Sequence, residues 1–164
     1  MRLLNALPVA ALFAGLTATS AIAATATGSF NVQVIIQESC TVTSASSTLL
    51  DFGTQGLLNA VVNASTTISA QCTSGTDYDI SLGQGQNASR RMRLLATANF
   101  VDYELYTDAA RTVIWPAVAG TAPYANIANG TSQNYTVYGQ IPVQTTPPAN
   151  ATAYTDVVAI TVTF

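Results

Sequence analysis

Two cysteines, Cys40 and Cys72, carry the first chemistry that this chain suggests. In an exported chain, which the N-terminus predicts, an even pair of cysteines is typical of a disulfide. The bond would close a loop of roughly thirty residues and would stabilise the fold by about 3–4 kcal/mol on the chain-entropy model. A free or catalytic thiol is the weaker interpretation, because the chain has no histidine to activate a thiolate.

Two pairs of carboxylates stand two residues apart, Asp77 with Asp79 and Asp102 with Glu104. At this spacing both members of a pair lie on one face of a β-strand. Paired carboxylates occur in glycosidases and calcium sites, but a calcium loop needs more oxygen ligands than a pair supplies. A solvated strand face is therefore the favoured interpretation. Without histidine, His-ligated zinc and the serine–histidine–aspartate triad are excluded, so we expect no enzyme, no metal and no cofactor.

A short basic run, Arg90-Arg91-Met92-Arg93, holds three of the five cationic residues of the chain. Such a run can attract an anionic surface, but so few charges usually lie in water. The formal net charge of the whole chain is −3. A negative chain with few cations argues against binding to nucleic acid.

The first 23 residues have the pattern of a secretory signal peptide. Arg2 supplies the positive charge, an apolar run extends from Leu3 to Leu16, and Ala21-Ile22-Ala23 is a small-residue cleavage site. The run is short for a membrane-spanning helix. We expect cleavage before Ala24 and export of a single domain, since 164 residues suffice for only one.

Apolar and polar residues alternate in several short stretches of the exported chain, as in half-buried β-strands. Apart from the signal, no window shows a sustained helical period, and the stretches recur roughly every ten residues. Abundant threonine and valine with few charges also favour strands. The sequence therefore predicts an all-β sandwich or barrel, with strands expected near 66–73, 78–82, 100–106, 133–143 and 154–164.

The most regular alternation lies in residues 28–37, called here the N-terminal segment, where Phe30, Val32, Val34 and Ile36 share one face. It follows the expected cleavage site and precedes Cys40. A strand near a free end is an aggregation hazard unless it has an assigned partner. Two alternatives are open: the segment pairs within its own domain, or it is donated to a neighbouring molecule, a known form of strand addition.

A series of short motifs is weak singly but specific in order and spacing. Besides the N-terminal segment leading into Cys40-Thr-Val, the motifs are Leu50-Asp-Phe-Gly53, Ile68-Ser-Ala-Gln-Cys72, Tyr78-Asp-Ile-Ser-Leu82, Tyr103-Glu-Leu-Tyr-Thr-Asp-Ala-Ala-Arg-Thr112, Val137-Tyr-Gly-Gln-Ile-Pro142 and Tyr154-Thr-Asp-Val-Val-Ala-Ile-Thr-Val-Thr-Phe164. Together with Trp115, this series resembles the spore coat protein U domain, the pilin domain of archaic (Csu-type) chaperone–usher pili. Pro116 departs from the pattern, because members of the family often have glycine after this tryptophan.

The resemblance implies an incomplete immunoglobulin-like β-sandwich that lacks its last strand and carries an N-terminal donor-strand extension. The domains would be a signal peptide (1–23), the extension (24–39) and the pilin domain (40–164). The implied function is that of a structural, non-enzymatic subunit of a surface pilus for adhesion and biofilm formation. Its partners would be a periplasmic chaperone, the outer-membrane usher and neighbouring pilin subunits, and the protein would pass through the periplasm to the cell surface.

The resemblance also implies a role for two apolar faces. Phe30, Val32, Val34 and Ile36 would be the donor strand, and burying four such side chains is worth roughly 6–12 kcal/mol before ordering costs. The edge of the acceptor groove would be formed by Val158, Ile160, Val162 and Phe164.

Two other functions remain open at this point. One is a self-contained secreted spore-coat or matrix protein whose N-terminal segment belongs to its own sheet. The other is an extracellular module that binds or cleaves carbohydrate, for which Tyr103, Tyr106 and Trp115 are the only plausible aromatic nucleus.

Overall fold

The computed structural model describes residues 23–42, 48–118 and 125–164, so the predicted signal peptide lies almost wholly outside the described residues. All regular structure in these ranges is β-strand, which confirms the all-β prediction. No helix of the described chain is long and apolar enough to cross a membrane. The strands are β1 (Cys40–Val42), β2 (Val62–Cys72), β3 (Asp77–Leu82), β4 (Arg91–Arg93), β5 (Phe100–Asp102), β6 (Glu104–Tyr106), β7 (Ala125–Ile127), β8 (Gln133–Ile141) and β9 (Ile160–Thr163).

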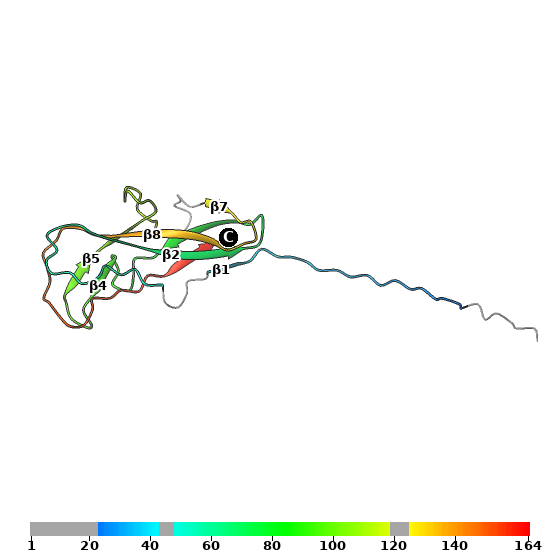
Figure 1. The fold of residues 1–164 in the computed structure, drawn as a ribbon, viewed down its shortest axis with the longest axis horizontal. Helices are drawn as coiled ribbons and strands as arrows, with labels where there is room; N and C mark the ends of the chain where they lie inside the picture. The colour runs from blue at the N-terminus through cyan, green and yellow to red at the C-terminus, as the bar shows by residue number, and fades with distance from the viewer. Residues whose placement is uncertain (1–22, 43–47, 119–124) are drawn as a thin grey trace, which may run out of the picture. The chain divides into compact units, whose positions relative to one another are not determined.

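The strands of the described ranges form three antiparallel sheets, with strand orders β1-β2-β8-β6, β7-β3-β9 and β4-β5. The long strands β2 and β8 run side by side through the first sheet (Figure 1), with Ile68 of β2 opposite Tyr135 of β8. In the second sheet, Ile80 of β3 lies opposite Val162 of β9. Each sheet turns its apolar face inward, as the alternation predicts for strands that share one core.

The core lies between these faces. Its members include Ile68, Ala70 and Cys72 from β2 and Ile80 and Leu82 from β3, which are the inward phases that alternation predicts. Trp115 is completely buried, and its indole nitrogen donates a hydrogen bond of 3.1 Å to the carbonyl oxygen of Ile80. This bond satisfies the only polar atom of the largest side chain in the core.

Two predicted strands are shorter or more broken than the pattern suggests. The stretch 100–106 splits at Tyr103, whose backbone nitrogen donates to the carbonyl oxygen of Arg90, so β5 joins β4 while β6 joins β8. The stretch 154–164 is regular only over Ile160–Thr163. The structure also adds β7, which lies outside the stretches where strands were expected.

The chain divides into two structural units, residues 1–35 and residues 36–164. The described residues of the first unit, 23–35, form no helix or strand. The four apolar residues that alternate along the N-terminal segment are highly exposed, Phe30 at 88%, Val32 at 84%, Val34 at 78% and Ile36 at 72%. Such a row of exposed apolar side chains is costly in water unless another surface covers it.

Candidate functional site

The outer edge of β9 is an unpaired strand edge, and Ile160 and Val162 of this strand pack against the core. β9 ends the order of its sheet and pairs on one side with β3, where Leu82 faces Ile160. The part of the chain that the structure describes supplies no strand for its other side. β1 likewise ends the order of the first sheet. β9 and β1 are therefore among the edge strands to which another strand can be added.

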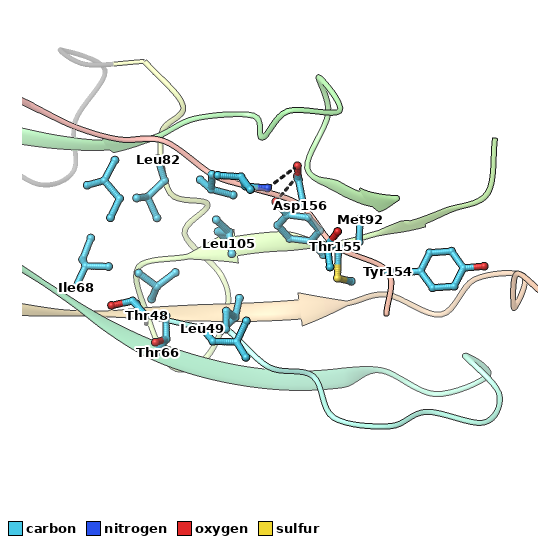
Figure 2. Close-up of a pocket in the computed structure, with 16 residues that line it drawn as sticks. Thr48, Leu49, Thr66, Ile68, Leu82, Met92, Leu105, Tyr154, Thr155 and Asp156 are labelled. Carbon is cyan, nitrogen blue, oxygen red and sulfur yellow. Dashed lines mark hydrogen bonds between the residues drawn. The ribbon is translucent and has the colours of Figure 1, made fainter. Parts of the chain in front are cut away.

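An open hollow of about 440 Å³ lies next to the N-terminal end of β9, where Ile160 lines it (Figure 2). We call it the groove. One wall is the stretch 48–50 after β1, and the other is the stretch 154–158 before β9. Figure 2 shows Leu49 and Asp156 on opposite sides. The floor comes from both sheets and is mostly apolar, including Ile68, Leu82, Leu105 and Val137.

The wall that contains Leu50 packs closely on β8. An added Cβ atom at Gly139 would come within 2.5 Å of Leu50 and 2.9 Å of Phe52. Only glycine lets the backbone of β8 approach these side chains so closely. The motif Leu50-Asp-Phe-Gly53 therefore has a structural role, which is to seat this wall of the groove on the first sheet.

The four residues predicted to form the acceptor edge divide among three places. Val158 and Ile160 line the groove, and Val162 is half-buried against the core. Phe164 lies at a separate shallow hollow, together with Ile127 and Asp79. The structure thus brings two of the four predicted side chains together in the groove and leaves their role as an acceptor edge a prediction.

Asp156 is a site residue that the sequence reasoning missed. Its Oδ1 accepts hydrogen bonds from the backbone nitrogens of Gln86 and Val157, both at 2.9 Å, and from the side-chain amide of Asn87 at 3.2 Å. Its Oδ2 accepts from the Tyr103 hydroxyl at 2.7 Å. The sequence does contain a signal for it. Asp156 lies two residues before Val158 and four before Ile160, so it falls on the face of the strand that is otherwise apolar. An inward carboxylate needs such partners.

Tyr103 is the buried partner of that carboxylate. Burial raises the pKa of Tyr103 above its ordinary value, and the hydrogen bond that its hydroxyl donates to Asp156 raises it further. The phenol therefore stays protonated and remains a donor throughout the physiological range.

Arg90 is buried, so the prediction of a solvated basic run is wrong at this position. Its guanidinium forms an ion pair with Glu104 and donates to the carbonyl oxygens of Leu82 at 2.8 Å and Trp115 at 2.6 Å. A third carbonyl oxygen, that of Leu105, lies at 3.3 Å. The planar fork of arginine satisfies several acceptors that apolar packing has removed from water. Glu104 is consequently not part of a solvated carboxylate pair.

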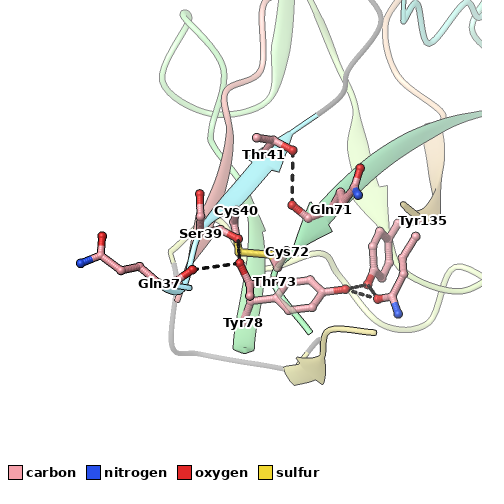
Figure 3. The surroundings of a disulfide bond; sticks show 10 residues. Gln37, Ser39, Cys40, Thr41, Gln71, Cys72, Thr73, Tyr78 and Tyr135 are labelled. Carbon is pink, nitrogen blue, oxygen red and sulfur yellow. Dashed lines mark hydrogen bonds between the residues drawn. A yellow bond between two sulfur atoms is a disulfide. The ribbon is translucent and has the colours of Figure 1, made fainter. Parts of the chain in front are cut away.

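The disulfide predicted from the two cysteines is present between Cys40 and Cys72 (Figure 3). The two residues are also cross-strand partners of β1 and β2. Immediately beyond the bond, the backbone nitrogen and the side-chain hydroxyl of Thr73 donate to the carbonyl oxygens of Ser39 and Gln37, at 2.9 and 3.1 Å. The backbone that enters β1 is therefore held by a covalent bond and by hydrogen bonds.

The proposed nucleus of a carbohydrate site is not available as an aromatic platform. Trp115 is completely buried, Tyr103 is buried and Tyr106 is half-buried. A sugar ring stacks on an exposed aromatic face, which the first two residues do not offer. Within the described ranges, no three histidine, cysteine, aspartate or glutamate side chains gather as metal ligands.

Asp108 offers a testable pH dependence in the loop after β6. Hydrogen bonds from the backbone nitrogens of Val113 and Thr112, the first being the larger cause, hold the pKa of Asp108 below its ordinary value of 3.8. A lowered folded-state pKa means that the stability is present above the unfolded pKa and is lost as pH falls through the folded one. We expect Asp108→Asn to lower the melting temperature at neutral pH and to flatten its decline below about pH 4. Parallel pH profiles of melting temperature for the two proteins would contradict this.

Comparisons with known proteins agree with the geometry. The Spore Coat Protein U domain matches residues 26–161. The chain is 31% identical over 159 residues to "Protein U" of Myxococcus xanthus, covering 87% of each protein.

Among solved structures, the chain is similar to one chain of the CsuC–CsuE complex of Acinetobacter baumannii. That complex is described as a chaperone–tip adhesion subunit pre-assembly complex from archaic chaperone-usher Csu pili. The match has 23% identity and a TM-score of 0.50, and it covers 79% of this chain but 40% of that one. At this identity the likeness shows the fold, an immunoglobulin-like β-sandwich. With most of its length matched by the family, the chain belongs to the Spore Coat Protein U domain family.

Proposed function

We propose that this protein is a structural subunit of a surface pilus assembled by the chaperone–usher pathway through donor-strand exchange. The observation that carries the proposal is the groove, an open apolar hollow beside the unpaired edge of β9. A sandwich with such an edge is completed when an extended strand enters and pairs with it. Backbone hydrogen bonds would supply affinity, and alternate side chains would fill the floor.

The donor would be the N-terminal segment of a neighbouring subunit. Its four alternating apolar residues are exposed, and they match an acceptor whose floor is apolar. Burial of four such side chains is worth roughly 6–12 kcal/mol before the ordering of the segment is counted. In this assignment residues 24–39 are the extension and residues 40–164 the pilin domain.

The partners that follow are a periplasmic chaperone, which would occupy the groove during export, the outer-membrane usher, and other subunits of the fibre. Membership of the family and the likeness to a chain of a chaperone–subunit complex support this set. The protein would be exported through the periplasm and function at the cell surface in adhesion and biofilm formation.

Leu49→Asp tests the groove without removing a core side chain. Leu49 lines the groove yet is 70% exposed, so the folded domain should tolerate the change. An incoming strand would desolvate the new carboxylate, and we expect the rate or affinity of fibre assembly to fall at least about 100-fold. Assembly is followed by light scattering and electron microscopy of the purified exported chain.

The matched control is Leu57→Asp. Leu57 is 68% exposed but does not line the groove, so this variant adds the same charge to an equally exposed leucine elsewhere. It should assemble like the parent protein. Equal assembly by the Leu49 and Leu57 variants would exclude the groove as the site of subunit addition.

A self-contained secreted coat protein is the second candidate, favoured by the 31% identity to Protein U and by the match of this chain to the Spore Coat Protein U domain. The N-terminal segment would then complete the sheet of its own molecule. Size-exclusion chromatography separates the two functions, because this candidate predicts a stable monomer whose residues 28–37 resist proteolysis. A pilus subunit would instead elute as polymers, or as a monomer whose residues 28–37 are cleaved readily by protease.

A further inference from the structure

Asp156 is the only charged side chain among the described residues that line the groove. A lone carboxylate in an apolar hollow would be costly if it were free, but both of its oxygens are occupied by donors. Three of these donors come from other parts of the chain, namely the Gln86 nitrogen, the Asn87 amide and the Tyr103 hydroxyl. The carboxylate therefore joins the wall of the groove to the turn between β3 and β4 and to the junction of β5 with β6.

These bonds fall where the backbone ladder beside the groove is interrupted. Thr155 exchanges backbone hydrogen bonds with Arg93 at 2.8 and 3.0 Å, and the Ala159 carbonyl oxygen accepts from Gly83 at 2.9 Å. Residues 156–158, which lie between these two points, belong to no strand. Along residues 155–159 the neighbouring segment changes from β4 to the end of β3. Between these two points the Asp156 carboxylate takes the place of the missing backbone hydrogen bonds.

The turn opposite Asp156 is fitted to the carboxylate. Gly85 has a φ of +77°, a conformation that favours glycine, and a Cβ atom added there would overlap the Asp156 carboxylate. A side chain at position 85 would displace Asp156 without removing it. The contact between the turn and the carboxylate can therefore be disturbed by a substitution at position 85 or at position 156.

We infer that Asp156 is a positioning residue that holds residues 155–159 in line with β9, so that a continuous edge from Thr155 to Thr163 is ready to accept a strand from a second copy of this chain. This inference rests on the proposed function and names the residue that prepares the acceptor. An edge that is already ordered loses less conformational freedom when the strand binds. Without the carboxylate, binding would have to order residues 156–158 first.

The test measures binding of a fluorescent synthetic peptide of residues 24–37 by anisotropy. The acceptor is the exported chain carrying Val32→Asp and Val34→Asp, changes that disable its own segment. Adding Asp156→Ala should weaken peptide binding at least about tenfold. Tyr103→Phe, which removes one of the hydrogen bonds, should weaken it less. Asp156→Asn should lie between the parent and the alanine variant, because an amide oxygen can still accept from the backbone nitrogens.

Asp108→Ala is the matched control, since Asp108 also accepts backbone hydrogen bonds but does not line the groove. It should lower the melting temperature and leave peptide affinity unchanged. Hydrogen exchange without peptide gives a second readout, in which the amides of Val157 to Ile160 should exchange faster in the Asp156→Ala variant but not in the Asp108→Ala variant. Gly85→Ala should also weaken peptide binding and speed exchange of these amides, although it keeps the carboxylate. This variant serves as the test if the Asp156→Ala variant does not fold.

The outcomes separate the two ideas. If the peptide does not bind the acceptor before position 156 is changed, the proposed function is wrong, and the inference is wrong with it. If the peptide binds that acceptor, and its affinity is unchanged when Asp156→Ala or Gly85→Ala is added, only the inference is wrong. An equal loss of affinity in the Asp108 variant would show a general effect of stability and would also overturn it.

Discussion

Replacing Val32 and Val34 together with aspartate is expected to stop fibre extension while leaving the fold of the subunit intact. Both side chains are highly exposed, so the stability of the domain does not depend on their burial. In a donor strand the same side chains would enter an apolar groove, where each unpaired carboxylate costs several kcal/mol. Two such costs are comparable to the roughly 6–12 kcal/mol that the apolar face would supply.

The measurement is polymerisation of the purified exported chain, followed by light scattering and electron microscopy, with melting temperature as the check on folding. The control is the double variant Asn31→Asp with Gln33→Asp, which adds the same charge on the other face of the segment. The control should polymerise and the Val32/Val34 variant should not. If both variants polymerise like the parent, the N-terminal segment is not the donor.

The direction of strand transfer gives this experiment a further arm. The Val32/Val34 variant keeps an intact groove, and the Leu49→Asp variant keeps an intact segment. Neither should extend a fibre alone. Mixed together they should form a pair and stop, because the pair retains only a damaged donor and a damaged acceptor. Continued growth in the mixture would show that subunits meet through another surface.

Alternation predicted the core of the sheets because side-chain direction along a strand has a period of two. Ile68 and Ala70 on β2, and Ile80 and Leu82 on β3, point inward as their phase requires. The disulfide was predictable too, since an exported chain with two cysteines has a single pairing.

The break at Tyr103 was not predictable from its neighbours. Alternation continues through Val101, Tyr103 and Leu105, and all three are buried as it requires. Which sheet each half joins depends instead on a distant residue, because the backbone of Arg90 takes the hydrogen bond at Tyr103. Local patterns report which face is buried, but not which strand lies alongside.

The candidate site was predictable in part for the same reason. The phase of residues 158–164 predicted an apolar face, and Val158 and Ile160 of this face line the groove. That the face forms an acceptor edge was implied by the family resemblance and stays a prediction. The opposite wall, which contains Leu49, comes from a stretch more than one hundred residues away and has no periodic signal. Asp156 could be noticed as a polar residue in an apolar phase, but its partners are set by the folding of the β3–β4 turn.

Replacing Arg90 is expected to destabilise the domain strongly, because its side chain is buried. Arg90→Met keeps much of the length of the side chain and removes the charge, which leaves Glu104 without its ion-pair partner. It also leaves the carbonyl oxygens of Leu82 and Trp115 without the donors that Arg90 supplies. Breaking a buried charged network of this kind costs about 3–5 kcal/mol. Urea denaturation of the exported chain measures the free energy of unfolding.

Arg91→Met is the matched control one residue along the chain. Arg91 is half-buried and lies over the ring of Phe100 at 4.5 Å, an interaction worth about 0.5–1 kcal/mol at exposed sites. A difference of several kcal/mol between the two variants is therefore expected, although both remove one arginine from the same run. Equal losses would mean that the hydrogen bonds of Arg90 contribute no more than a surface contact does. The expected difference follows from burial, since only Arg90 serves acceptors that water cannot reach.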